Sequence, residues 1–113
     1  MFKLVRDRIP ELIKKSGQIC NYAEVKNKEL FIELLRAKLI EETNEFLNSG
    51  SIEELADIKL VIETFAELLC GSKEDLEKTY AAKVDERGKF DNKYIVFLPD
   101  QQYQTEQESE QNN

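Results

Sequence analysis

The chain contains no histidine among its 113 residues, and this absence excludes several kinds of chemistry. Without an imidazole, neither a Ser-His-Asp triad nor a Cys-His pair can form, and no metal can be bound through histidine. Any metal site must therefore use carboxylate or thiolate ligands. Cysteine is also scarce, because Cys20 and Cys70 are too few for a four-ligand zinc site in one chain. We expect both to be reduced thiols in the core.

The chain also lacks an excess of positive charge, since its 16 Lys and Arg residues are outnumbered by 23 Asp and Glu residues. The formal net charge is -7, and the four acids of the last 14 residues account for -4 of it, which leaves -3 for the rest. A mildly acidic body lacks the basic surface that phosphate contacts with nucleic acids need, so we expect no nucleic-acid binding. No charged segment followed by an apolar run opens the chain, and no apolar run is long enough to span a bilayer. We expect a cytoplasmic protein without membrane contact.

The length predicts one domain, over residues 1–99, that is small enough to benefit from dimerisation. Residues 100–113 are rich in Gln and Glu, and we expect a disordered acidic tail there. The fold class that we predict is all-α, a four-helix-type bundle with one or two short extended segments. The first helix surrounds Pro10 and stops at Gly17. The other expected helices run from an Asn27 cap to about Leu47, from Ser51 onward, and from Ser72 to Gly88.

Two segments lack a helical pattern. Residues 18–26 are expected to form an extended connection or a short strand. The run Tyr94–Leu98 is rich in strand-forming residues and precedes a proline, which predicts a short strand that pairs with residues 18–25 or with a partner chain.

The second expected helix carries acids on its apolar side. An α-helix turns about 100° per residue, so the apolar residues that follow Leu30 gather in one half of the helical wheel. Glu42 and Glu45 fall in the middle of that half. Burying two like charges among leucines costs several kcal/mol unless each is paired, bound to a cation or protonated. A group of opposite charge should therefore face them.

The third expected helix supplies further acids. Glu54 lies within its apolar side and Asp57 lies at the edge of it. A short turn makes the two helices antiparallel neighbours, so the four acids can face each other across one seam. Their repulsion favours a hard divalent cation, and a ligand set made only of oxygen suits Mg²⁺ or Mn²⁺. Alternatively, Glu54 only completes a capping box with Ser51.

Several other side chains near this seam have two interpretations each. Glu41 lies at the edge of the same stripe, where it either orients water as a base or is simply an exposed acid. Lys38 either contacts a phosphate or pairs with Glu42 at i,i+4. The cations Lys3, Arg6 and Arg8, which surround Asp7, either bind an anion or form a solvated, self-paired surface. Lys83 and Arg87 either face the carboxylates or phosphates, or lie at a helix C-terminus whose dipole favours cations.

Three motifs in this order carry a resemblance to a known family. They are the ExxE of Glu42 and Glu45 with the ExxD of Glu54 and Asp57, the opening KLVRDRIPELI (Lys3–Ile13), and KVDERGKF (Lys83–Phe90). The chain resembles the all-α nucleoside triphosphate pyrophosphohydrolases of the MazG-like superfamily. Within it, the chain is similar to a small branch described as phosphoribosyl-ATP pyrophosphohydrolase-like.

The resemblance implies a helical bundle, usually a homodimer or a higher homo-oligomer, that cleaves a nucleoside triphosphate into its monophosphate and pyrophosphate with Mg²⁺ or Mn²⁺. Non-standard nucleotides are the expected substrates, in a house-cleaning role. It implies metal ligands at Glu42, Glu45, Glu54 and Asp57, catalytic roles for Glu41, Glu42 and Glu45, and phosphate binding by Lys38, Lys83, Arg87 and Arg6. Two alternatives stay open, namely a non-catalytic helical interaction module and hydrolysis of phosphoribosyl-ATP.

Overall fold

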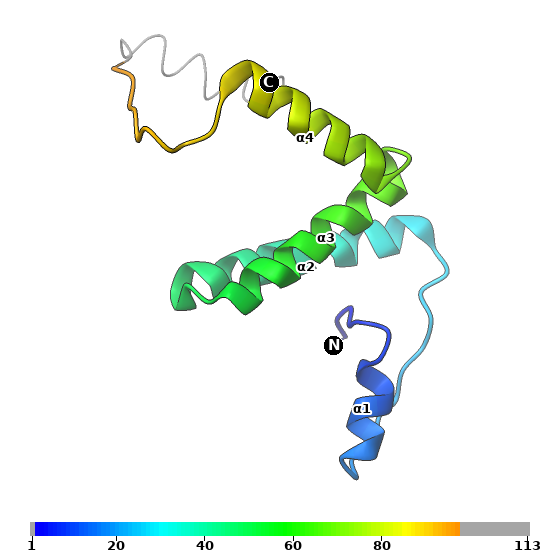
Figure 1. Cartoon of the computed structure of the whole chain (residues 1–113). Helices are drawn as coiled ribbons and strands as arrows, with labels where there is room; N and C mark the ends of the chain where they lie inside the picture. The colour runs from blue at the N-terminus through cyan, green and yellow to red at the C-terminus, as the bar shows by residue number, and fades with distance from the viewer. Residues whose placement is uncertain (1, 98–113) are drawn as a thin grey trace. The chain divides into compact units, whose positions relative to one another are not determined.

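Four helices make up the regular structure of the described residues. The computed structural model describes residues 2–97, and its helices are α1 (Ile9–Lys15), α2 (Lys28–Ser49), α3 (Ile52–Leu69) and α4 (Lys73–Arg87). The predicted all-α class is therefore confirmed for the described residues (Figure 1). The expected tail, residues 100–113, lies outside them. Contacts divide the chain into two compact units, Met1–Thr79 and Tyr80–Asn113, with the boundary inside α4.

Helix α2 begins and ends where local chemistry requires it. The Asn27 side chain caps its start by accepting a hydrogen bond of 2.8 Å from the Leu30 backbone N–H. Its end is set by Gly50, which adopts a left-handed conformation with φ of 66° and donates its N–H to the Phe46 carbonyl at 2.8 Å. The helix extends two residues beyond the predicted end at Leu47. Glycine enters the left-handed region at little cost, so the helix continues until it reaches one.

The start of α3 differs from the predicted capping box. Ser51 Oγ accepts the Glu53 backbone N–H at 3.1 Å and donates to the Glu53 carboxylate at 2.7 Å. The Glu54 carboxylate instead accepts a hydrogen bond of 2.8 Å from Ser49 Oγ at the end of α2. The capping alternative for Glu54 is therefore wrong, because the Ser51 backbone N–H that a capping box would satisfy donates instead to Ser49 Oγ at 3.1 Å. Glu54 remains free to face α2.

Helices α2 and α3 form an antiparallel hairpin, and this pair carries the tertiary packing of the first unit. Figure 1 shows the two helices lying side by side, joined by the short turn at Gly50. Among the described residues the buried apolar side chains are those of Leu35, Val61 and Ala66, which is a thin core for a unit of this size. Large apolar side chains stay exposed on both helices, including Ile40, Leu47 and Ile52. One copy of the chain therefore buries only part of its apolar surface.

The two segments expected to be extended form no strand within residues 2–97. Residues 18–26 form an irregular connection between α1 and α2, as one of the two expectations had it. Tyr94–Phe97 are exposed and form no strand with residues 18–25, so that predicted pairing is wrong for these four residues, while pairing with a partner chain stays a prediction. A strand needs a neighbour for its backbone hydrogen bonds, and local strand propensity cannot supply one. Leu98 lies outside the described residues.

Both cysteines are free thiols, as predicted. Cys20 is half-buried, but Cys70 is exposed, so its expected place in the core is wrong. The reason is its position as the C-cap of α3, where the chain leaves the hairpin. No helix in the described range combines the length and the apolar character needed to cross a membrane.

Candidate functional site

Glu42 is the one charged residue that the hairpin buries among the described residues. Its exposed fraction is 5 %, and its Oε2 lies 3.5 Å from Nζ of Lys38, one turn earlier on α2. Its Oε1 is buried and has no hydrogen-bond partner within residues 2–97. An unsatisfied buried polar atom costs about 1–3 kcal/mol, and more when it is charged. Lys38 therefore pairs with one carboxylate oxygen of Glu42 and leaves the other, Oε1, without a partner.

Two acids of α3 approach the Glu42 carboxylate across the hairpin. Glu42, Glu54 and Asp57 each offer one carboxylate oxygen, and the three oxygens lie within 4.8 Å of one another. Glu54 and Asp57 are half-buried. Sequence reasoning had predicted this encounter, because the short turn makes α2 and α3 neighbours. We call these three residues the inter-helix trio.

Glu45 lies in a second group of acids. One oxygen each of Glu41, Glu42 and Glu45 lies within 4.8 Å of the other two, and Glu42 belongs to both groups. The four acids predicted to share one metal site therefore fall into two groups of three, which have Glu42 in common. Glu45 itself is exposed, so its predicted burial is wrong. Three residues after Glu42 it is rotated by about 60° around the helix axis, which moves it from the seam to the solvent side.

The two adjacent acids Glu41 and Glu42 titrate in opposite directions. Burial raises the pKa of Glu42 above its ordinary 4.5, the negative charges of Glu45 and Asp57 raise it further, and Lys38 offsets only part of this. Partial burial also raises the pKa of Glu41, but the hydrogen bond from Lys3 and the charge of Lys38 outweigh it, so that the net pKa is lowered. Glu41 is therefore the readily ionised member of the pair.

Cations of the N-terminal segment, residues 2–8, already contact these acids. Lys3 Nζ lies 3.3 Å from Glu41 Oε2, and the Arg6 guanidinium is paired with Asp57. Lys38 lies 3.6 Å from Glu41 as well as near Glu42, which confirms the predicted pairing at i,i+4. These two N-terminal contacts span 38 and 51 residues of sequence, and no local pattern predicts them.

Arg8 behaves differently from its neighbours Lys3 and Arg6. It pairs with Glu11 of α1 at 3.5 Å and does not line the cleft described below. For Arg8, the interpretation as a self-paired surface cation is the one that the structure supports.

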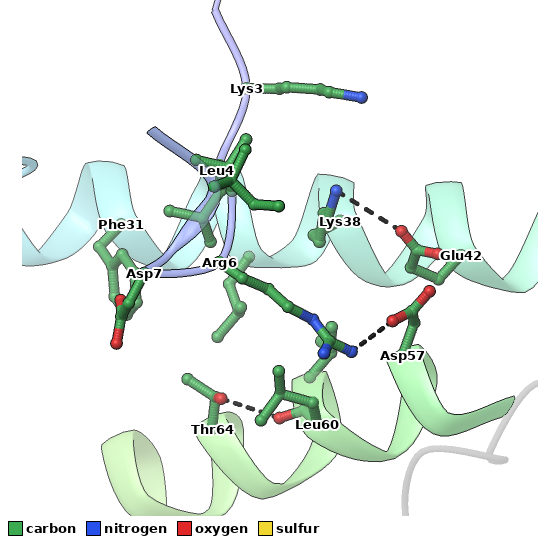
Figure 2. Close-up of a pocket in the computed structure, with 14 residues that line it drawn as sticks. Lys3, Leu4, Arg6, Asp7, Phe31, Lys38, Glu42, Asp57, Leu60 and Thr64 are labelled. Atoms are coloured by element: carbon green, nitrogen blue, oxygen red, sulfur yellow. Dashed lines mark hydrogen bonds and ion pairs between the residues drawn. The ribbon is translucent and has the colours of Figure 1, made fainter. Parts of the chain in front are cut away.

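A cleft of about 670 Å³ separates the N-terminal segment from the hairpin. Figure 2 shows Arg6 extending along it to Asp57, and Lys38 pointing along α2 to Glu42. Lys38, Glu42 and Asp57 lie at one end, which we call the charged end, while Phe31 and Asp7 lie at the other. The cleft is lined by Lys3, Leu4, Val5, Arg6, Asp7, Ile9, Phe31, Leu35, Lys38, Glu42, Asp57, Leu60, Val61 and Thr64. Sequence reasoning had not named Asp7, Leu60 or Thr64 for this place.

The two remaining predicted phosphate ligands lie on α4. Lys83 and Arg87 belong to the second compact unit, and the Arg87 Nε lies 3.2 Å from the carboxylate of its neighbour Glu86. Their part in phosphate binding stays a prediction.

The donor set of the inter-helix trio fits a hard cation. It consists entirely of carboxylate oxygens, and the Glu42 carboxylate carries a buried oxygen with no partner among the described residues. Mg²⁺ and Mn²⁺ prefer such ligands, whereas thiolate-seeking or imidazole-seeking metals would find neither group here. Three clustered acids alone would not indicate a ligand, since such clusters are common on protein surfaces. The buried Oε1 of Glu42 is the independent observation that does.

Comparisons of the chain with family models, with curated proteins and with solved structures found no match. The chemistry of the site is therefore inferred from its residues and their geometry.

Proposed function

We propose that this chain is a Mg²⁺-dependent nucleoside triphosphate pyrophosphohydrolase, which cleaves the α–β phosphoanhydride to yield a monophosphate and pyrophosphate. The observation that carries the proposal is the buried Oε1 of Glu42, which lacks a partner in the described structure and sits within an all-oxygen trio at the end of a cleft. The resemblance noted in the sequence points to the same reaction.

Glu42, Glu54 and Asp57 would hold the metal, with Glu45 and Glu41 close by in the overlapping group. A bound Mg²⁺ supplies charge neutralisation on the phosphate oxygens and acidifies a coordinated water. Ser49 holds the Glu54 carboxylate in place through its hydroxyl. The role of the hairpin is thus to gather acids from two helices before any ligand arrives.

Glu41 is suited to accept the proton of the attacking water. Its carboxylate is ionised at neutral pH, and it lies in the same acidic group as Glu42. Lys3 and Lys38 contact it on two sides and fix its orientation. A general base must be ionised and positioned, and Glu41 meets both requirements.

Three cations at the charged end of the cleft, Lys3, Arg6 and Lys38, would contact the substrate phosphates. They provide local positive charge in a protein whose net charge is negative, which an anionic substrate requires. Lys83 and Arg87 are further candidates on α4. The apolar side chains that line the cleft, among them Phe31 and Leu60, would take the base and sugar, since nucleoside pockets are mostly apolar.

The active form in this proposal is a homodimer or a larger homo-oligomer in the cytoplasm. Ile40, Leu47 and Ile52 are 62 %, 72 % and 74 % exposed, while only three apolar side chains of the described residues are buried. A second copy that covers these side chains would supply the apolar burial that the single hairpin lacks.

The test is pyrophosphate release from a panel of nucleoside triphosphates, including non-standard and damaged bases, and from phosphoribosyl-ATP, with and without Mg²⁺. We expect Mg²⁺-dependent formation of monophosphate and pyrophosphate, with a house-cleaning preference for non-standard bases. Glu42→Gln and Asp57→Asn should abolish it. Glu67→Gln, which makes the same change at an exposed position of α3, should leave it intact and serves as the matched control.

The rival is a non-catalytic helical module, whose acids serve only as ion-pair partners. It accounts for the contacts of Glu41 and Asp57, but it leaves Oε1 of Glu42 without a function. Absence of turnover by the wild-type chain, or equal turnover in Glu42→Gln and Asp57→Asn, would favour the rival. Turnover of phosphoribosyl-ATP alone would instead assign the reaction to that one substrate.

A further inference from the structure

Arg6 forms an ion pair with Asp57, one of the acids that the proposed function assigns to the metal. Its guanidinium is paired with Asp57, although 51 residues separate the two in sequence. The pair is partly solvated, with 52 % of the Arg6 side chain and 33 % of the Asp57 side chain exposed. A partly exposed ion pair of this kind is weak and can be exchanged for another partner.

A guanidinium and a divalent cation beside the same carboxylate repel each other, so the two cannot both reside there without cost. Arg6 is anchored on the cleft side of the hairpin, because its neighbours Leu4 and Val5 also line the cleft. If Arg6 leaves Asp57, its side chain stays at the charged end of the cleft, near Lys38. An anion bound there would offer the displaced guanidinium a new partner.

We propose that Arg6 is a built-in counter-ion of the acidic site, which a divalent cation displaces from Asp57 and which phosphate groups in the cleft then bind. This inference rests on the metal site of the proposed function and assigns Arg6 a role within it. Metal binding alone is weakened by the need to displace Arg6. Metal and polyphosphate together bind more tightly than the product of their separate affinities, because the phosphates compensate for the lost ion pair.

The neighbouring Arg8 provides a control within the same segment. It carries the same charge, pairs with Glu11 instead, and does not line the cleft. Arg8→Gln therefore removes one positive charge two residues away without touching Asp57. Arg6→Lys keeps the charge and changes only the donor group. Together with Arg6→Gln, which removes the guanidinium itself, these two variants separate local competition for Asp57 from a general change in protein charge.

The experiment measures Mn²⁺ binding to the full-length chain by the loss of the free-ion EPR signal, with no nucleotide present. We expect Arg6→Gln to bind Mn²⁺ on the order of ten times more tightly than wild type. Arg8→Gln and Arg6→Lys should stay within about twofold of wild type. In wild type, the Arg6 side-chain N–H signal in ¹H–¹⁵N spectra, identified by its loss in Arg6→Gln, should shift on addition of Mg²⁺, while the Arg8 signal should not.

Equal Mn²⁺ affinity in Arg6→Gln and Arg8→Gln would overturn the counter-ion role and leave the metal site standing. No Mn²⁺ binding in wild type or in any variant would overturn both the site and this inference. The steady-state kinetics add a second criterion, since Arg6→Gln should raise KM for the nucleotide although it tightens the metal. If Arg6→Gln strengthened or weakened the binding of both Mn²⁺ and the nucleotide, the proposed exchange of Asp57 for phosphate as the partner of Arg6 would be contradicted.

Discussion

Replacing Glu42 by Gln should make the metal-free protein more stable while it removes the proposed function. The substitution keeps the shape of the side chain and abolishes its charge. In the folded hairpin, Oε1 of Glu42 is buried with no partner in the described chain, whereas in the unfolded chain it is hydrated. Natural sites for ligands often reduce the stability of the empty protein in this way.

The change that Glu42→Gln makes to the free energy of unfolding follows from two opposing contributions. An unsatisfied buried polar atom costs about 1–3 kcal/mol, and the substitution relieves much of this because a neutral amide is easier to bury than a carboxylate. The ion pair of Lys38 with Glu42, at 3.5 Å within one helix, is lost, which costs about 0.3–0.5 kcal/mol. We expect a net gain of about 1 kcal/mol in the free energy of unfolding at pH 7.

The assay is urea unfolding of both proteins in EDTA at several pH values and at one protein concentration. The pKa of Glu42 is raised in the fold, so its ionised form destabilises the folded state. This destabilisation is absent below the unfolded value of 4.5 and grows as the pH rises through the folded pKa. The advantage of Glu42→Gln should therefore be largest at neutral pH and disappear near pH 4.5.

Mg²⁺ should reverse the order of stability. A ligand at 100 times its dissociation constant stabilises the protein that binds it by about 2.7 kcal/mol, and only wild type should gain this. Glu41→Gln is the matched control on the adjacent residue. Because the pKa of Glu41 is lowered in the fold, its ionised form stabilises above pH 4.5, and this substitution should destabilise the empty protein. A metal-free Glu42→Gln protein that is less stable than wild type at pH 7 would refute the reasoning.

Three further predictions concern the fold and the assembly. Gly50→Ala should lower the free energy of unfolding by about 1–2 kcal/mol in urea titrations, because Gly50 has a φ of 66° and no atom within 4 Å of the added methyl group offsets the strain. Asn27→Ala should cost about 1 kcal/mol in the same assay, because it removes the cap on the Leu30 N–H. Leu47→Glu, at a 72 % exposed position of α2, should shift the mass measured by light scattering from oligomer to monomer, whereas a wild-type monomer would contradict the proposed assembly.

The local features of the fold could be predicted from sequence because each depends on a few neighbouring residues. Asn27 as a cap, Gly50 as a helix stop and the short turn between α2 and α3 all follow from the chemistry of single residues. The pairing expected between 94–98 and residues 18–25 is absent from the described part for the opposite reason, because a strand depends on a partner that local sequence does not specify. Local propensity indicates what a segment favours, and long-range contacts decide what it forms.

The candidate site divides along the same line. Helical periodicity and the short turn correctly predicted that Glu42 lies close to Glu54 and Asp57. The prediction that Glu45 is buried was wrong. A helical-wheel argument counts the whole apolar half of a helix as buried, although only the centre of that half faces the neighbouring helix. The arrival of Arg6 at Asp57 could not be predicted, because it depends on how residues 2–8 fold back over the hairpin. The motif containing Arg6 was visible in the sequence, but its partner was not.

The tight turn at Gly50 also bears on when this site can come into being. All three carboxylates of the inter-helix trio belong to one continuous stretch, Glu42 to Asp57, that bends back on itself at this turn. Closing so short a loop costs little chain entropy and takes well under a millisecond. During synthesis, the acids can therefore meet as soon as α3 has emerged from the ribosome, before α4 has emerged. Residues 2–8 have been made by then, so their cations are on hand to shield the acids from the beginning.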